Sequence, residues 1–214
     1  MNTMDISPER ISNRRAAIVR ACLLFWLVYT LLQSLFLAGL LKDPLASLLR
    51  LLPGLAGIAI SFSSGLPAQY HYLRLGRIST AGLALYAALL IFGALTVLPT
   101  GRYIGWNPLE ALIYAPIGAL SQEIFFRVSL LPVLLWLQEG QRWPALMIHA
   151  LLFGLWHIGA IFAGASVVEA IPVMLVPFLF SIAWGWQAMR DRTAVWAVLH
   201  HTLLLIMMSF YTWD

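Results

Sequence analysis

The sequence predicts an all-α membrane protein, a helix bundle with about seven transmembrane helices and almost no water-soluble part. Hydrophobic residues make up 61% of the 214 residues and charged residues only 10%, whereas a soluble domain carries roughly 25% charged residues. Several apolar stretches reach the roughly 20 residues that a helix needs to cross a bilayer. Basic residues collect in alternate short loops, which is typical of polytopic membrane proteins.

Seven stretches are long and apolar enough to be spans. They are residues 17–41, 45–66, 79–99, 110–137, 144–164, 167–189 and 194–211. The fourth is longer than one span requires, so we expect a tilted or broken helix, or a re-entrant turn around Pro116 and Gly118. Because no repeat or long linker divides the chain, we predict a single membrane domain over residues 1–214.

The basic residues predict the orientation of this domain, because Lys and Arg collect in cytoplasmic loops. The predicted inside segments contain Arg10, Arg14, Arg15, Arg20, Arg74, Arg77, Arg142, Arg190 and Arg192. The only basic residues in the predicted outside segments are Lys42 and Arg102. The N-terminus is therefore expected inside. The arginines form no stripe or block, so we expect membrane lipids as partners and no nucleic acid.

Ionisable residues within spans are candidates for function, because burying one costs roughly 2.5–3.5 kcal/mol on insertion scales. They are Arg50, Glu123, Arg127, His149, His157, His200 and His201. Arg50 lies about one turn into its span, and we interpret it as an interface anchor whose charge reaches the headgroups. His149 precedes His157 by eight residues, roughly 80° around a helix, so we expect it off the site. Glu110 lies three residues after Asn107, the spacing between an N-cap residue and position N3 of a helix. Helix capping therefore explains why a glutamate is found there.

The remaining residues can form a hydrolytic site. Glu123 and Arg127 are four residues apart, which puts them on one helix face within ion-pairing distance. His157 and one of the adjacent His200 and His201 come from two further spans. A carboxylate and imidazoles around one water can provide a general base for attack on a peptide carbonyl. The same residues could instead serve helix packing, or proton coupling in a small transporter.

Three motifs in order resemble the CPBP family of intramembrane proteases, which includes the CAAX prenyl endopeptidases and bacteriocin-processing and self-immunity proteins. The family pattern is E-E-x-x-x-R, then F-x-x-x-H, then H-x-x-x-N or D. Residues 122–127 read QEIFFR, Phe153 and His157 form the second motif, and His201 begins the third, with a slight preference over His200. The resemblance covers about residues 105–211. It implies a peptide or protein substrate with a membrane-associated segment, such as a C-terminal anchor, a bacteriocin leader or a prenylated tail, and location in a bacterial cytoplasmic membrane.

Two positions depart from the family pattern. The resemblance implies that the first glutamate activates water and the second pairs with the arginine, but the first position is Gln122 and an amide cannot accept a proton. Leu205 replaces the polar residue four positions after His201. We therefore expect Glu123, with Gln122, Arg127, His157 and His201, to form the catalytic site. The alternative is a catalytically inert relative that acts as a membrane partner or immunity protein.

No cofactor is expected. Two histidines and a carboxylate are a plausible zinc set, so zinc is the alternative. The chain lacks the H-E-x-x-H motif that would place two zinc ligands on one helix. The resemblance implies a glutamate-dependent hydrolase for which a metal is not required.

Overall fold

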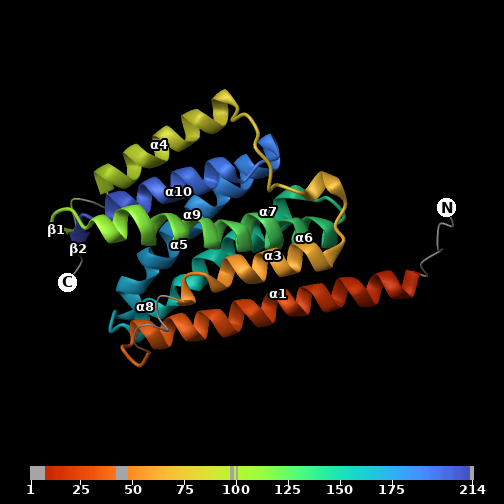
Figure 1. Ribbon diagram of the computed structural model, residues 1–214, viewed down its shortest axis with the longest axis horizontal. Helices are drawn as coiled ribbons and strands as arrows, with labels where there is room; N and C mark the ends of the chain where they lie inside the picture. Colours follow the sequence, from red (N-terminus) through yellow and green to blue (C-terminus); the bar gives the residue numbers. More distant parts are fainter. Residues whose placement is uncertain (1–7, 42–47, 97–98, 100, 213–214) are drawn as a thin grey trace.

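The computed structural model describes residues 8–41, 48–96, 99 and 101–212, and helices dominate it (Figure 1). The main helices are α1 (Pro8–Leu37), α3 (Leu52–Ser64), α4 (Thr80–Thr96), α5 (Ala115–Glu123), α6 (Leu131–Leu137), α7 (Arg142–Leu155), α8 (Gly159–Phe162), α9 (Val167–Asp191) and α10 (Val195–Met208). Shorter helical segments are η1 (Ala68–Tyr70), η3 (Glu110–Tyr114), η4 (Ile124–Leu130) and η5 (Trp156–Ile158). Two-residue strands β1 (Arg102–Tyr103) and β2 (Tyr211–Thr212) pair antiparallel. The predicted all-α membrane bundle is confirmed.

Each of the seven predicted stretches contains an apolar helix. Among the described residues, four segments are long enough to cross a membrane, namely Asn13–Leu37, Glu110–Leu137, Arg142–Phe162 and Val167–Asp191. The other three stretches contain the shorter apolar helices α3, α4 and α10. The start of the second predicted stretch and Lys42 lie outside the described residues.

The fourth predicted stretch is one continuous helix from η3 to α6, so, of the alternatives expected for it, the re-entrant turn near Pro116 is wrong. Two π-helical segments interrupt its α-helical pattern. The N–H of Ala115 donates to the carbonyl of Glu110, and that of Leu131 donates to Phe126, each five residues back. Pro116 lies in the first turn of α5, directly after the first π-helical segment, where its missing N–H is accommodated without breaking the helix.

Glycines let α3 pack closely against the middle of this long helix. A Cβ on Gly57 would lie 2.8 Å from Cα of Phe125, and one on Gly54 would lie 3.2 Å from Cα of Ser121. Ser121 Oγ accepts a hydrogen bond from the N–H of Gly54 at 2.7 Å, and Ser129 Oγ donates to the carbonyl of Gly57. Small residues and interhelical hydrogen bonds are the usual means by which membrane helices associate. They fix the long helix against the N-terminal half.

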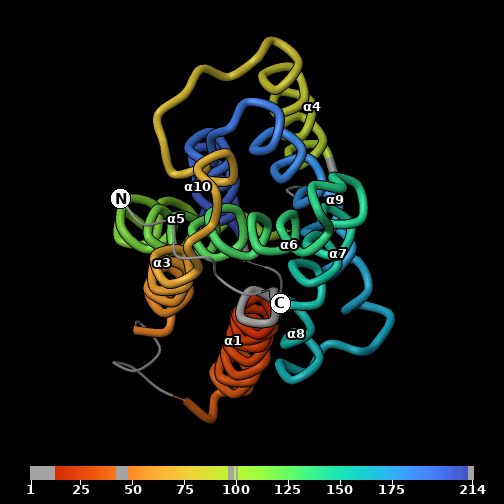
Figure 2. Tube along the Cα trace, turned by 90° about the vertical axis from the view of Figure 1, so that its right-hand side faces the viewer, coloured from red at the N-terminus to blue at the C-terminus, as the bar shows by residue number. Residues whose placement is uncertain are grey.

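The long helix from η3 to α6 forms the centre of the bundle. Figure 2 shows α1 and α3 on one side of it, α4 and α10 on the other, and α7 and α9 beside it. Its segments contact α3, α7 and α10, while α7 packs along α9. In an 18-residue window of this helix 72% of the residues are buried, against 22% in α1. A polar residue on the central helix is therefore enclosed by protein on most sides.

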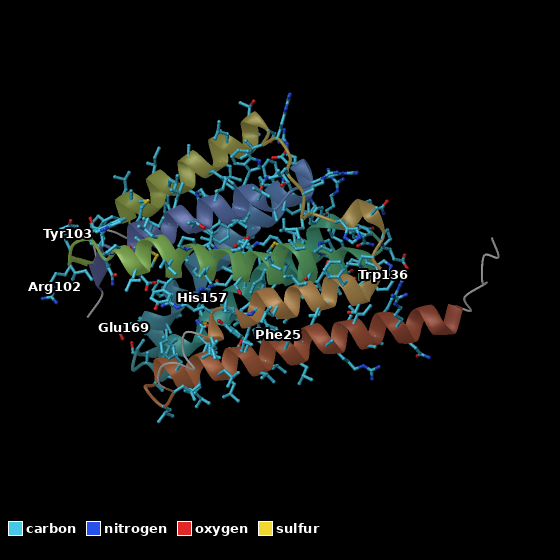
Figure 3. All side chains as sticks on the ribbon, viewed as in Figure 1. Phe25, Arg102, Tyr103, Trp136, His157 and Glu169 are labelled. Atoms are coloured by element: carbon cyan, nitrogen blue, oxygen red, sulfur yellow. The ribbon has the colours of Figure 1, made fainter. Side chains whose placement is uncertain are left out.

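Arginine-bearing segments that are distant in the sequence meet at one end of the bundle. Arg14 near the start of α1 donates to the carbonyl of Ser63 at 3.1 Å, and Arg74 donates to the carbonyl of Arg192 at 2.6 Å. Figure 3 shows Arg102 at the opposite end. This separation agrees with the alternation of inside and outside segments in the sequence. Which end faces the cytoplasm stays a prediction.

Candidate active site

Glu123 and Arg127 form a fully buried ion pair in the middle of the central helix. Nε of Arg127 lies 2.9 Å from Oε2 of Glu123, and both side chains have 0% exposure. Glu123 is the last residue of α5, and Arg127 lies in the π-helical η4. The two atoms are close, but the N–H does not point at the oxygen, so the contact is an ion pair without an aligned hydrogen bond. Each charge is compensated within the protein.

Aromatic rings surround the guanidinium of Arg127. Its central carbon lies 4.4 Å from the ring centroid of Phe153 and 5.0 Å from that of Trp184. Its Nη1 is buried and makes no hydrogen bond in the described part of the chain. Ring faces attract cations, more strongly where water is excluded. The rings therefore compensate in part for the missing hydrogen bond, and they hold the arginine on the side of Glu123.

His201 completes the contacts of the Glu123 carboxylate. Its Nδ1 lies 2.8 Å from Oε1 of Glu123, across 78 residues of sequence. His200 lies elsewhere, because its Nδ1 accepts from the indole N–H of Trp184 at 2.9 Å and its Nε2 is 3.0 Å from the carbonyl of Tyr86. Neighbouring residues on α10 point about 100° apart. Of the two adjacent histidines, the structure brings His201 and not His200 to the carboxylate.

His157 lies beside this group without a direct bond to Glu123. It belongs to the 3₁₀ turn η5 that follows α7, and its Nδ1 is 3.0 Å from the carbonyl of Phe153. The Phe153 ring contacts both histidines, with centroid distances of 5.3 Å to His157 and 6.2 Å to His201. The contact to a backbone carbonyl fixes the orientation of the His157 ring and uses Nδ1, which directs Nε2 to other partners.

His149 faces the neighbouring helix α9 and is linked to Arg127 through one hydroxyl. His149 is fully buried, and its Nδ1 is 3.3 Å from Oγ of Ser181. The same hydroxyl is 3.2 Å from Nη2 of Arg127. The 80° rotation does not separate the two histidines, because His149, Phe153 and His157 form one ridge at i, i+4 and i+8, and ridges of this kind pack along a neighbouring helix. Arg127 lies over the middle of that ridge. Ser181, one serine in an apolar helix, was missed in the sequence.

Gln122 lines a cavity next to the buried pair. The cavity has a volume of about 350 Å³, and Leu205 lines it as well. Its other lining residues are Tyr29, Gln33, Phe36, Leu37, Leu49, Arg50, Glu110, Tyr114, Ala115, Gly118, Met208 and Ser209. Glu123, His157 and His201 are not in its lining. The two residues that depart from the family pattern thus line the cavity, and the carboxylate of Glu123 does not.

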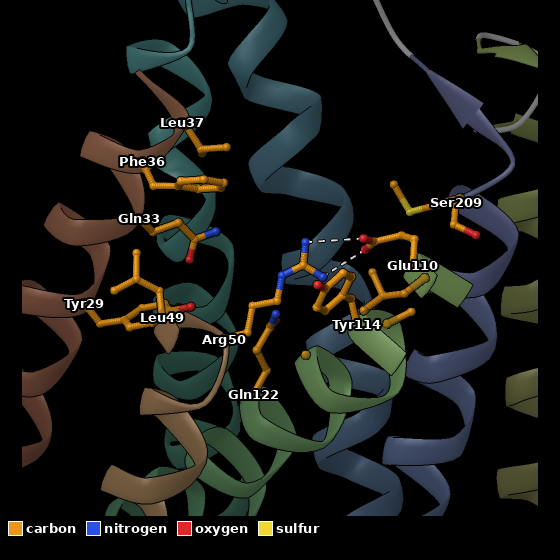
Figure 4. Close-up of a pocket in the computed structure, with 14 residues that line it drawn as sticks. Tyr29, Gln33, Phe36, Leu37, Leu49, Arg50, Glu110, Tyr114, Gln122 and Ser209 are labelled. Atoms are coloured by element: carbon orange, nitrogen blue, oxygen red, sulfur yellow. Dashed lines mark hydrogen bonds and ion pairs between the residues drawn. The ribbon is translucent and has the colours of Figure 1, made fainter. Parts of the chain in front are cut away.

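Arg50, which we interpret from the sequence as a headgroup anchor, has a partner within the protein. Its Nη1 and Nη2 lie 3.0 and 3.4 Å from the two carboxylate oxygens of Glu110, and its guanidinium lies 4.6 Å from the ring centroid of Tyr114. Figure 4 shows this ion pair in the cavity, with Gln122 pointing toward Arg50. Glu110 also occupies its predicted position in the cap, because its N–H donates to Asn107 Oδ1 at 3.2 Å. Each residue had a sufficient local explanation, so the pair was missed.

Metal binding has no visible support in the described residues. No group of three His, Cys, Asp or Glu side chains among them is arranged to hold a metal ion. The expectation that no cofactor is needed stays a prediction, which a chelator applied to the active protein would test.

Residues 104–207 match the family model of the Rce1-like type II CAAX prenyl endopeptidases. The match covers just under half of the chain and includes every residue of the buried group. It confirms the resemblance of this region to the CPBP family. Neither a curated protein nor a solved structure matches the chain.

Proposed function

We propose that the protein is an intramembrane endopeptidase in which a water beside Glu123 and His201 attacks a peptide bond of a membrane-associated substrate. The 2.8 Å contact between the Glu123 carboxylate and the His201 imidazole carries this proposal. A carboxylate that holds an imidazole by Nδ1 leaves Nε2 to exchange protons, and a carboxylate can itself accept a proton. The Rce1-like match of this region supports a protease in particular.

The reaction requires one proton acceptor and one stabiliser of negative charge. The water oxygen bonds to the carbonyl carbon as the water gives a proton to Glu123 directly or to Nε2 of His201. The carbonyl oxygen becomes an oxyanion, and the C–N bond then breaks as that proton passes to the leaving amine. His157 donates its Nδ1–H to the Phe153 carbonyl, so its neutral ring presents Nε2 as an acceptor that can orient the attacking water. It can donate from Nε2 to the oxyanion only as an imidazolium, and a positioned donor to the oxyanion is usually a large contribution to such reactions.

Arg127 has a positioning role in this mechanism. Its ion pair with Oε2 fixes one edge of the carboxylate, while His201 contacts Oε1. Each carboxylate oxygen has two lone pairs, so neither contact prevents Glu123 from accepting a hydrogen bond from water.

Cleavage by the Glu123→Gln variant tests the proposal. Three tagged reporters are co-expressed with the protein, one with a C-terminal anchor, one with a bacteriocin leader and one with a prenylated tail. Loss of the base should reduce the cleavage rate by about 10²–10⁴-fold at equal protein abundance, because the amide keeps the packing and accepts no proton. Cleavage at the wild-type rate by an equally abundant Glu123→Gln protein would show that Glu123 is structural.

A second candidate function is that of a catalytically inert relative that binds a membrane partner. The observation that favours it is the cavity, because its lining presents Gln122 and Leu205 where the family pattern has a carboxylate and a polar side chain. The Gln122→Glu variant separates the two functions. If the wild-type protein is a working peptidase, this variant should keep or raise its activity. If it is an inert relative, the wild-type protein should cleave none of the reporters, and activity should appear only when the new carboxylate is present.

We further propose that the arginine-rich end of the bundle faces the cytoplasm of a bacterial cell. A topology reporter inserted between Arg190 and Arg192 should then report the cytoplasm, and one fused after Asp214 the opposite side. Both reporters on one side would contradict the seven-span arrangement.

A further inference from the structure

The cavity in front of the buried group contains a charged pair that the proposed reaction does not use. Arg50 and Glu110 come from segments 60 residues apart and meet with 37% and 34% of their side chains exposed. The Tyr114 ring lies against the guanidinium and holds it. Contacts that carry two parallel bonds between a guanidinium and a carboxylate are specific in geometry. The cavity wall therefore already accommodates a carboxylate on Arg50.

A second polar group in the cavity lining, the side-chain amide of Gln33, has an oxygen without a hydrogen-bond donor in the part of the chain that the structure describes. Oε1 of Gln33 is buried and makes no hydrogen bond within the described residues, although a buried acceptor without a partner is costly. Gln33 lies on α1 and lines the same cavity as Arg50. An amide oxygen is the complement of a peptide N–H. Arg50 and Gln33 together match a short peptide segment that carries a carboxylate.

The cavity also has the space for such a segment. Its volume of about 350 Å³ is at the lower end of the range for small-ligand sites. A Cβ added to Gly118, which lines the cavity from the central helix, would meet no atom within 4 Å. Gln122, which also lines the cavity, directly precedes the buried Glu123 in the chain, so a ligand here lies near the proposed reaction site.

We propose that this cavity is a substrate subsite in which Arg50 binds a carboxylate of the peptide, which displaces or shares the contact with Glu110, while Gln33 accepts a peptide N–H. This inference deepens the proposed peptidase function and rests on it, because the bound peptide is a substrate only if the protein cleaves it. The carboxylate can come from the end of a peptide or from an acidic side chain. Arg50 and Gln33 lie outside the Rce1-like match, so the N-terminal half contributes the selectivity.

Binding to the Glu123→Gln protein tests the subsite without requiring catalysis. The probes are dansyl-Leu-Val-Leu as the free acid, the same peptide as its amide, and dansyl-Leu-Asp-Leu amide, with binding followed by fluorescence anisotropy in detergent. The free acid should bind about 10- to 100-fold more tightly than its amide, the range expected for hydrogen bonds to a charged group. Tight binding of the aspartate peptide instead would assign the site to acidic side chains. Equal and weak binding of all three would overturn the proposal.

Opposite effects of the two charged residues distinguish a subsite from a structural ion pair. Arg50→Gln should abolish the preference for the free acid. Glu110→Gln should increase the affinity for the free acid, since it removes a competing carboxylate, and leave the amide unchanged. A purely structural pair predicts that both variants change the binding of acid and amide alike, and that result would overturn the proposal.

Filling the cavity provides an independent check on its location. Gly118→Leu should weaken binding of the free acid at least tenfold. The matched control is Gly93→Leu on α4, where a Cβ meets only Leu204 within 4 Å, and it should bind as the parent does. Unchanged binding by a folded Gly118→Leu protein would place the ligand elsewhere. Failure of the wild-type protein to cleave any of the reporters would overturn the peptidase function alone, because these binding results do not depend on cleavage.

Discussion

The two carboxylate–guanidinium pairs seen among the residues that the structure describes differ in burial and in origin. Glu123 and Arg127 are four residues apart on one helix and have no exposure, whereas Arg50 and Glu110 join distant segments and keep about a third of their side chains exposed. A buried pair is strongly destabilising to break, because the remaining charge cannot be hydrated. An exposed pair contributes little and exchanges partners readily. The first pair is suited to hold a fixed geometry, and the second to bind a ligand.

The largest expected difference between the two regions is in catalysis. His201→Ala should reduce cleavage by about 10²–10⁴-fold, because it removes a positioned proton carrier from Glu123. His200→Ala is the matched control on the next residue, which contacts Trp184 and Tyr86 instead. Its activity per folded molecule should stay within a few-fold of wild type. Equal losses for the two variants, measured per folded molecule, would contradict the assignment of His201.

The next difference is in stability. Arg127→Met strands a buried carboxylate and should lower the free energy of unfolding by roughly 3–5 kcal/mol. The same substitution at Arg50 should lower it by about 0–1 kcal/mol. Unfolding in a series of denaturing detergent mixtures gives both values. Combining Arg127→Met with Glu123→Gln removes both charges and should recover part of the loss. Similar losses at Arg50 and Arg127 would remove the distinction between the pairs.

The smallest effect concerns the hydrogen bond that anchors Arg127 at its other end. Ser181→Ala removes a hydroxyl that contacts Nη2 of Arg127 and Nδ1 of His149. We expect a loss of about 1–3 kcal/mol in stability, typical for a buried hydrogen bond to a charged group, and a reduced cleavage rate with unchanged KM. Ser181→Thr keeps the hydroxyl and should restore the rate. Failure of the threonine variant to restore it, in a folded protein, would assign Ser181 to packing.

Local periodicity predicted the parts of this site that depend on one helix. The pairing of Glu123 with Arg127 follows from their spacing alone. The contact between Glu123 and His201 could be predicted only from the order of the three motifs, since residues 78 positions apart share no local periodicity. The Arg50–Glu110 pair and the Ser181 contact were missed because tertiary packing creates them. Each of these residues had a sufficient local explanation: Arg50 as an interface anchor, Glu110 as a capping residue and Ser181 as one serine in an apolar helix.

The π-helical segment η4 makes the length of the central helix as important as its composition. Arg127 lies within Ile124–Leu130, where carbonyls receive their hydrogen bonds from five residues ahead. Deleting one residue there would let an ordinary α-helix form, still apolar and still able to span a bilayer. Because a π-helical turn accommodates one extra residue, the residues before and after it would keep nearly the same relative orientation, and the contacts of α6 could be retained. The widened turn that contains Arg127 would be lost, and with it the present position of Arg127 relative to Glu123. A deletion at this segment should therefore be accepted by the fold and still disturb the buried ion pair.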